Sequence, residues 1–128
     1  MIVGVGIDMV EVERMRTLID RKGERALARL FTAGERAYAS SHPEPHRQLA
    51  ARVAAKEAAY KALSGNDIAK AIGWRELEVV SRRGCAPELV LHGRARVRAA
   101  ELGVDRVHLS ITHTEHMAAA YVVAERVG

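Results

Sequence analysis

The chain has 128 residues, 48% of them hydrophobic and 28% charged, which predicts one domain (residues 1–128) with a real hydrophobic core. No apolar run approaches the roughly 20 residues that a membrane span needs, so we expect no membrane contact. The start does not resemble a signal peptide, and the single Cys85 excludes an internal disulfide, so we expect a cytoplasmic protein. The net charge of +4 favours an acidic partner or a phosphorylated ligand, whereas the scattered aromatic residues argue against nucleic-acid binding by base stacking.

The alternation of apolar residues and glycines predicts a first strand over Met1–Asp8, with Gly4, Gly6 and Asp8 on one face. Glycines beside an acidic residue leave room for something to approach the backbone and the carboxylate. Asp8 has two interpretations, a metal ligand or the start of a helix capping box with Glu11. The two roles can coexist where a strand meets a helix.

A basic helix is predicted from Val10 to about Arg29, with a break near Gly23. Several of its arginines, including Arg14, share one side. Such charges form either an ordinary solvated face or a docking surface for an acidic helix. The motif Thr32-x-x-Glu35 then resembles a capping box that opens a short helix.

The segment Arg52–Leu63 is rich in helix formers and contains no Gly or Pro, so it predicts a central helix. Its alanines form one side and allow a neighbour to come close, while Lys56 points into the apolar stripe on another side. That stripe consists of Leu49, Val53, Tyr60 and Leu63. Glu57 and Lys61 lie one turn apart, and taken alone they are a surface ion pair that contributes roughly 0.2–0.5 kcal/mol.

The rest of the chain predicts short strands, one helix and a closing hairpin. The segments are a strand at Trp74–Ser81, a strand at Glu88–His92, a helix at Arg94–Leu102, a strand containing Val107, Leu109 and Ile111, a loop at His113–His116, and a strand at Ala118–Glu125. This order predicts an α+β fold in which a largely antiparallel sheet packs with the long central helix.

Asp8, Glu57 and Lys61 form a candidate site if the strand and the central helix meet. Two carboxylates from different elements suit Mg²⁺, which completes its shell with waters and substrate phosphates. A lysine one turn from the glutamate can neutralise charge on a phosphoryl group. His113 and Thr114, as donors on a loop, suit a phosphate better than a zinc ion, because no third zinc ligand is evident.

Several motifs span nearly the whole chain: Gly6-Ile-Asp-x-Val-Glu-x-x-Arg14, Phe31-Thr-x-x-Glu35, Arg52-x-Ala-Ala-Lys-Glu-Ala-x-x-Lys-Ala-Leu63, Ile72-Gly-Trp-x-x-Leu-Glu-Val79, Leu91-x-Gly93 and Leu109-Ser-Ile-Thr-His-Thr114. Together they resemble the holo-acyl-carrier-protein synthase family, the short bacterial 4′-phosphopantetheinyl transferases. The resemblance implies Mg²⁺-dependent transfer of 4′-phosphopantetheine from coenzyme A to a serine of apo-acyl carrier protein, with release of adenosine 3′,5′-bisphosphate, in fatty acid biosynthesis.

The resemblance also implies roles for individual residues. Asp8 and Glu57 would hold Mg²⁺ against the pyrophosphate, Lys61 would contact the same phosphates, and Glu57 or a metal-bound water near it would be the general base. The nucleotide end of coenzyme A would be bound by Arg52, His113 and Thr114. Arg14 and its basic neighbours would meet the acidic carrier protein. By the same resemblance, the chain would form a homotrimer with active sites between subunits.

Two hypotheses from other classes remain beside the transferase. One is a small basic RNA-binding module, and the other is an adaptor that uses the basic helix to dock an acidic partner. Neither of them needs Asp8, Glu57 and Lys61 together.

Overall fold

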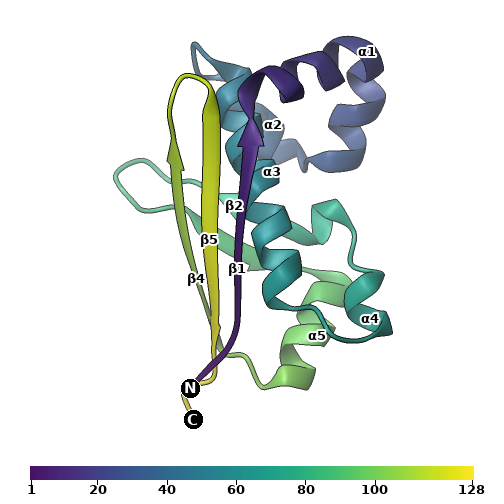
Figure 1. Cartoon of the computed structure of the whole chain (residues 1–128), viewed down its shortest axis with the longest axis vertical. Helices are drawn as coiled ribbons and strands as arrows, with labels where there is room; N and C mark the ends of the chain where they lie inside the picture. The colour runs from purple at the N-terminus through teal and green to yellow at the C-terminus, as the bar shows by residue number, and fades with distance from the viewer.

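The computed structural model describes residues 1–128 and contains five α-helices, one 3₁₀ helix and five strands, arranged as in Figure 1. In chain order these are β1 (Ile2–Glu11), α1 (Val12–Leu30), α2 (Ala33–Ser40), α3 (Pro45–Ala62), α4 (Asp67–Lys70), η1 (Trp74–Glu76), β2 (Leu77–Val80), β3 (Glu88–Leu91), α5 (Gly93–Leu102), β4 (Arg106–His113) and β5 (Met117–Glu125). None of the helices is both long and apolar enough to span a membrane.

The main sheet has the strand order β1-β5-β4, with both pairings antiparallel, and β2 pairs with β3 in a separate two-stranded sheet. Helix α3 packs along the main sheet, α1 and α2 lie at one end of the molecule, and α4 and α5 lie toward the other end (Figure 1). The two chain termini meet at that second end, where the ammonium of Met1 donates to the carbonyl of Arg126 at 2.7 Å.

Two glycines of β1 allow α3 to lie directly against the strand. A Cβ on Gly4 would stand 2.0 Å from the carbonyl oxygen of Ala62, and a Cβ on Gly6 would stand 1.8 Å from that of Ala58. Real atoms do not approach so closely, so side chains are excluded at both positions. The sequence predicted that something approaches this face of the strand, and in the structure it is the alanine side of the central helix.

Helix α3 is buried along most of its length, which explains its unusual content of alanine. Between Leu49 and Leu63 the side chains that are not buried are those of Glu57, Tyr60 and Lys61. Burial of Leu49 and Leu63 confirms part of the predicted apolar stripe. Tyr60 was predicted to join that stripe, but it is 38% exposed, and its hydroxyl donates to the carbonyl of Lys70.

Local sequence signals in the first third of the chain are confirmed. Gly23 interrupts α1 with φ 57° and ψ −135°, a conformation that glycine adopts without strain. The motif of Thr32 and Glu35 forms a complete capping box: the amide of Glu35 donates to Thr32 Oγ1 at 3.2 Å, and the amide of Thr32 donates to Glu35 Oε1 at 2.9 Å.

The strand predicted from Trp74 is shorter than expected. Residues Trp74–Glu76 form the 3₁₀ turn η1, and only Leu77–Val80 pair as a strand. The Glu76 carboxylate accepts one local hydrogen bond, from the amide of Gly73 at 2.7 Å, and one tertiary hydrogen bond, from the amide of Arg94 at 2.6 Å. Together they favour a turn over an extended chain. An alternating pattern of side chains does not reveal such contacts.

Glu78 on β2 links the two-stranded sheet to the start of α2. Its Oε2 accepts from Thr32 Oγ1 at 2.6 Å, and its Oε1 lies 3.0 Å from Nε2 of His92. The hydrogen bond from Thr32 lowers the pKa of Glu78 below its ordinary value; burial opposes this shift, and His92 lowers the pKa further.

We expect Glu78→Gln to flatten the acid dependence of stability. A carboxylate whose pKa is lowered by folding contributes stability that is present above its ordinary pKa and is lost as pH falls through the lowered value. Melting temperatures of the wild type and the variant should therefore differ most near neutral pH and converge below about pH 4. Parallel curves, like those expected for Glu88→Gln on the exposed end of β3, would contradict this.

Candidate active site

Asp8 and Lys61 meet where β1 crosses α3. Lys61 Nζ donates to Asp8 Oδ1 at 3.1 Å and to the carbonyl of Ile7 at 2.9 Å. Glu57 lies one turn before Lys61 on α3 and makes no hydrogen bond within the chain, so the local ion pair with Lys61 is not formed. The ammonium of Lys61 is bound instead by the strand that the glycines bring against the helix.

The capping interpretation of Asp8 is wrong. Helix α1 begins at Val12, and its N-cap residue is Glu11, which makes no side-chain capping bond. Pairing with β5 continues through Glu11 opposite Met117, so β1 is longer than the sequence predicted, and Asp8 lies inside the strand. Its carboxylate is therefore free to face α3.

The charge of Asp8 acts on the carboxylate of Glu57. Burial raises the pKa of Glu57 above its ordinary value, the charge of Asp8 adds to this rise, and the ammonium of Lys61 opposes it. Two carboxylates with a single ammonium leave a local excess of negative charge. The chain holds no group of three or more His, Cys, Asp or Glu residues placed to bind a metal. The pair therefore fits a hard cation that takes its other ligands from water and substrate, as Mg²⁺ does.

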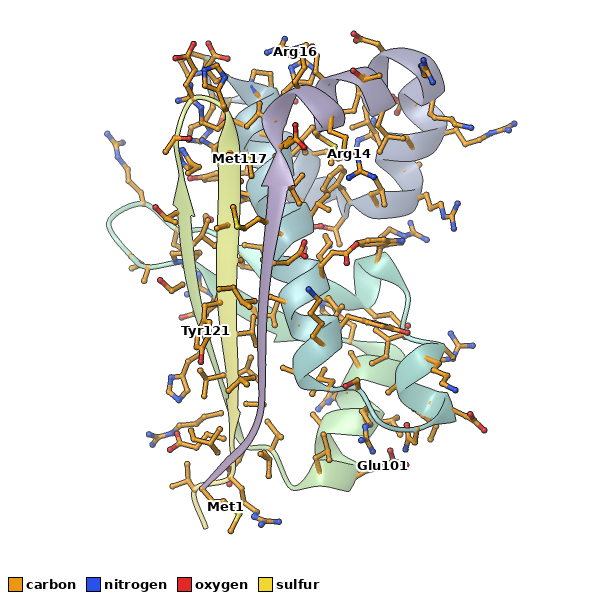
Figure 2. The ribbon with its side chains drawn as sticks, in the orientation of Figure 1. Met1, Arg14, Arg16, Glu101, Met117 and Tyr121 are labelled. Carbon is orange, nitrogen blue, oxygen red and sulfur yellow. The ribbon has the colours of Figure 1, made fainter.

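Glu57 borders two hollows on the surface. One, of about 250 Å³, is lined by Tyr60, Ile72 and Trp74 among others. The second, of about 430 Å³, is lined by Asp8 and Arg14 together with apolar side chains, and Trp74 borders it too. Figure 2 shows Arg14 reaching into the space beneath α1, whereas Arg16 leaves the helix on another side.

His113 and Thr114 lie apart from this group within one chain. His113 ends β4, and β5 separates that strand from β1. The amide of Thr114 donates to the carbonyl of Met117 at 2.8 Å, and its hydroxyl accepts from the amide of Met117 at 3.1 Å, which closes the hairpin. Both residues are exposed.

Arg52 is also placed away from Asp8 and Glu57. It is 2% exposed, donates to Ser81 Oγ at 2.9 Å and stacks over the ring of Tyr38 at 4.2 Å. Burial lowers its pKa, and the charge of Glu35 opposes that shift. The guanidinium of Arg52 is engaged with Ser81 and Tyr38 of the same chain, and the nucleotide contact expected of it stays a prediction.

The sequence does not reveal the place of Trp74, which borders both hollows beside Glu57. Available signals were that it is the only tryptophan of the chain and that it follows Gly73. Neither signal tells which helix the indole faces, since that depends on the turn η1.

Comparisons with known proteins match the chain over nearly its whole length. The sequence profile of the 4′-phosphopantetheinyl transferase superfamily matches residues 4–123. A holo-[acyl-carrier-protein] synthase of Solibacter usitatus is 42% identical over 125 residues, which cover 98% of this chain and 99% of that protein. The crystal structure of holo-[acyl-carrier-protein] synthase from Neisseria meningitidis superposes with a TM-score of 0.86 at 30% identity, over 98% of this chain and 100% of that one. The synthase of Bacillus anthracis in complex with CoA (3′,5′-ADP) superposes with a TM-score of 0.76 at 33% identity, over 99% of each chain.

The chain therefore belongs to the 4′-phosphopantetheinyl transferase superfamily. Its full-length relatives are holo-[acyl-carrier-protein] synthases, so it is an enzyme of that kind. The predicted α+β fold, with a largely antiparallel sheet packed against a long central helix, is confirmed. These matches support neither an RNA-binding module nor an adaptor.

Proposed function

We propose that this chain transfers 4′-phosphopantetheine from coenzyme A to a serine of apo-acyl carrier protein in a Mg²⁺-dependent reaction that releases adenosine 3′,5′-bisphosphate. The observation that carries the proposal is the convergence of Asp8, Glu57 and Lys61 at the crossing of β1 and α3. A coenzyme A complex of a relative with the same fold supports the choice of donor substrate.

Asp8 and Glu57 would hold the metal ion. When bound, Mg²⁺ would neutralise charge on the pyrophosphate of coenzyme A and so favour attack at phosphorus. The ammonium of Lys61 pairs with Asp8 and is half exposed, so it would donate to the phosphate oxygens and stabilise the leaving group.

The serine hydroxyl of the carrier protein must lose its proton as its oxygen attacks. The new bond joins serine oxygen to the phosphorus that carries the pantetheine arm, and the bond from that phosphorus to the bridging oxygen breaks. In the metal-free chain, burial and the charge of Asp8 raise the pKa of Glu57, so this carboxylate accepts a proton more readily than an ordinary surface glutamate does. Glu57 would take the proton directly or through one water.

The direct test is mass spectrometry of an apo carrier protein incubated with this chain, coenzyme A and Mg²⁺. We expect the carrier to gain the mass of one phosphopantetheine and adenosine 3′,5′-bisphosphate to accumulate in equal amount. A carrier of unchanged mass with coenzyme A and Mg²⁺ in excess would overturn the proposal.

We also propose that the chain acts as a homotrimer, with His113 and Thr114 of one subunit serving the nucleotide bound near Asp8 and Glu57 of another. Support comes from the face of the main sheet turned away from α3, which carries large apolar side chains where a monomer would carry polar ones. Ile7 and Tyr121 are opposite each other on this face, 59% and 44% exposed, and Val5 and Met9 extend it. A second copy of the chain, with the same apolar face, is the occupant that we infer.

Light scattering should give three times the 14.0 kDa mass of the chain. Tyr121→Asp should shift the mass toward one chain and lower transfer, because a charge is placed on the apolar face. Val97→Asp, which changes an apolar residue of similar exposure on α5, should leave the mass unchanged. A fully active monomeric wild type would contradict sites shared between subunits.

The carrier protein is proposed to dock on α1, so that its serine enters through the hollow that Arg14 borders. Carrier proteins are typically acidic, and charges at the rim of an interface act mainly on encounter and register. Arg14→Glu should therefore raise KM for the carrier and leave KM for coenzyme A nearly unchanged. Arg16→Glu is the matched control, because Arg16 faces another side of the helix near Glu13 (Figure 2). Equal effects of the two substitutions, or an Arg14 effect confined to coenzyme A, would contradict this docking.

We propose further that residues 1–128 form a single domain and that the enzyme works in the cytoplasm, in fatty acid biosynthesis. The superfamily profile extends over residues 4–123, which supports one domain. Cys85 is exposed and free, which suits a reducing compartment.

A further inference from the structure

A fully buried cation directly precedes Glu57 on α3. The Nζ atom of Lys56 is 0% exposed and lies 2.8 Å from Glu35 Oε1. It donates to the backbone carbonyls of Trp74 at 2.9 Å and Leu77 at 2.7 Å. An ammonium has three protons, and all three have a partner here. Lys56 therefore fixes both ends of the turn η1 against the helix that carries Glu57.

Glu35 is held as firmly as its partner Lys56. It is 1% exposed, its Oε1 also accepts from the amide of Thr32 at 2.9 Å, and its Oε2 accepts from the amide of Val79 at 2.8 Å. This one ion pair joins the start of α2, the middle of α3, and β2. A buried ion pair is often no more stabilising than apolar side chains of the same volume, so the geometry it imposes is the better explanation of its presence.

The ion pair of Lys56 and Glu35 fixes the position of the Trp74 backbone. Its backbone is tied down by Lys56, and its side chain borders both hollows beside Glu57, the one shared with Tyr60 and the one shared with Arg14. A third hollow, of about 500 Å³ beneath α1, is also lined by Trp74. Trp74 is thus common to all three hollows, and its backbone carbonyl is held by the buried ion pair.

We propose that Lys56 and Glu35 are positioning residues that hold Trp74 as the wall between the two hollows beside Glu57. The proposal rests on the transfer reaction proposed above, in which the carrier serine enters by the hollow that Arg14 borders. The wall then limits where the serine oxygen and the diphosphate can meet. Misplacement of reacting groups by about 1 Å costs on the order of 100-fold in rate, so a displaced wall acts on kcat more than on substrate binding.

The test uses the intrinsic fluorescence of the chain, because Trp74 is its only tryptophan. Lys56→Met should change the emission maximum and raise quenching by acrylamide, and it should lower kcat by about tenfold or more while both KM values stay within about twofold. Trp74→Ala should lower kcat at least as much. In the Trp74→Ala background, Lys56→Met should lower kcat no further, since the two residues act through one wall.

Removal of one buried charge leaves the other unpaired, so Lys56→Met alone risks unfolding. The double variant Glu35→Gln with Lys56→Met removes both charges, and it should show the same changes in emission and kcat. The matched control is Arg98→Met. Arg98 is also a buried cation that donates to two backbone carbonyls, those of Leu63 at 2.8 Å and Ser64 at 2.9 Å, but it touches neither Trp74 nor Glu57. We expect this control to lower the melting temperature with emission and kcat unchanged.

Unchanged emission and kcat in a folded Lys56 variant would overturn the proposal. A further fall of kcat when Lys56→Met is added to Trp74→Ala would do the same, because Lys56 would then act by another route. Equal losses of kcat in the Arg98 control would show general loosening of α3 instead of a wall. A wild-type chain without transfer activity would overturn the proposed function, and the emission of the variants would still decide whether Lys56 positions Trp74.

Discussion

Replacing Glu57 by glutamine is expected to lower transfer by about 100-fold or more while the fold stays intact. Glutamine keeps the size of the side chain but cannot take the serine proton, and it is a weaker ligand for a hard cation. Melting temperature should hold or rise slightly, because the raised pKa of Glu57 means that its charge is unfavourable in the folded chain. Activity should thus fall without a loss of stability, and both are measured on the same preparation.

This pattern separates a catalytic carboxylate from an ordinary surface ion pair. If Glu57 only paired with Lys61, the substitution would cost roughly 0.2–0.5 kcal/mol of stability and leave activity intact. Glu88→Gln on β3 is the control and should change neither quantity, because Glu88 is exposed and lines neither of the hollows that Glu57 borders. A fall in activity of less than about tenfold, or roughly 1.4 kcal/mol of barrier, would favour the ion pair.

Local chemistry explains which parts of the fold could be predicted from the sequence. The capping box of Thr32 and Glu35 and the break at Gly23 involve residues within one turn of each other, and both are formed. The similar pattern at Asp8 and Glu11 is not formed as a cap, because strand pairing with β5 extends through it. A short motif is therefore informative only where no longer-range hydrogen bonds compete for the same backbone.

In the candidate site, too, the sequence reveals local features and does not reveal contacts between distant segments. Residue types and family resemblance led to Asp8, Glu57 and Lys61 as candidates, but helix spacing paired Lys61 with Glu57, whereas in the structure it pairs with Asp8. The contact with Asp8 depends on how closely β1 approaches α3, which no spacing along one helix can tell. The buried place of Lys56 was visible as a charge pointing into an apolar stripe, whereas its partners come from three other segments.

The close approach of β1 and α3 yields the second prediction, Gly6→Ala. The added Cβ would stand 1.8 Å from the carbonyl oxygen of Ala58, and a backbone atom of a buried helix cannot move aside alone. Helix α3 must then shift from the strand, which we expect to cost about 3 kcal/mol, the upper part of the usual range for overpacking. Thermal melts should show a fall of about 10 °C for a chain of this size.

The same shift would separate Glu57 and Lys61 from Asp8, so transfer should fall even at temperatures where Gly6→Ala remains folded. Gly34→Ala is the control: its Cβ would lie 3.4 Å from Glu78 Oε2 on β2, an ordinary contact. Gly34 belongs to helix α2, where alanine is favoured over glycine by up to about 1 kcal/mol. That variant should melt at or above the wild-type temperature with full activity. A Gly6→Ala chain that melts like the wild type would mean that α3 has room to move, and the joining of Asp8 to Lys61 would then not depend on glycine in β1.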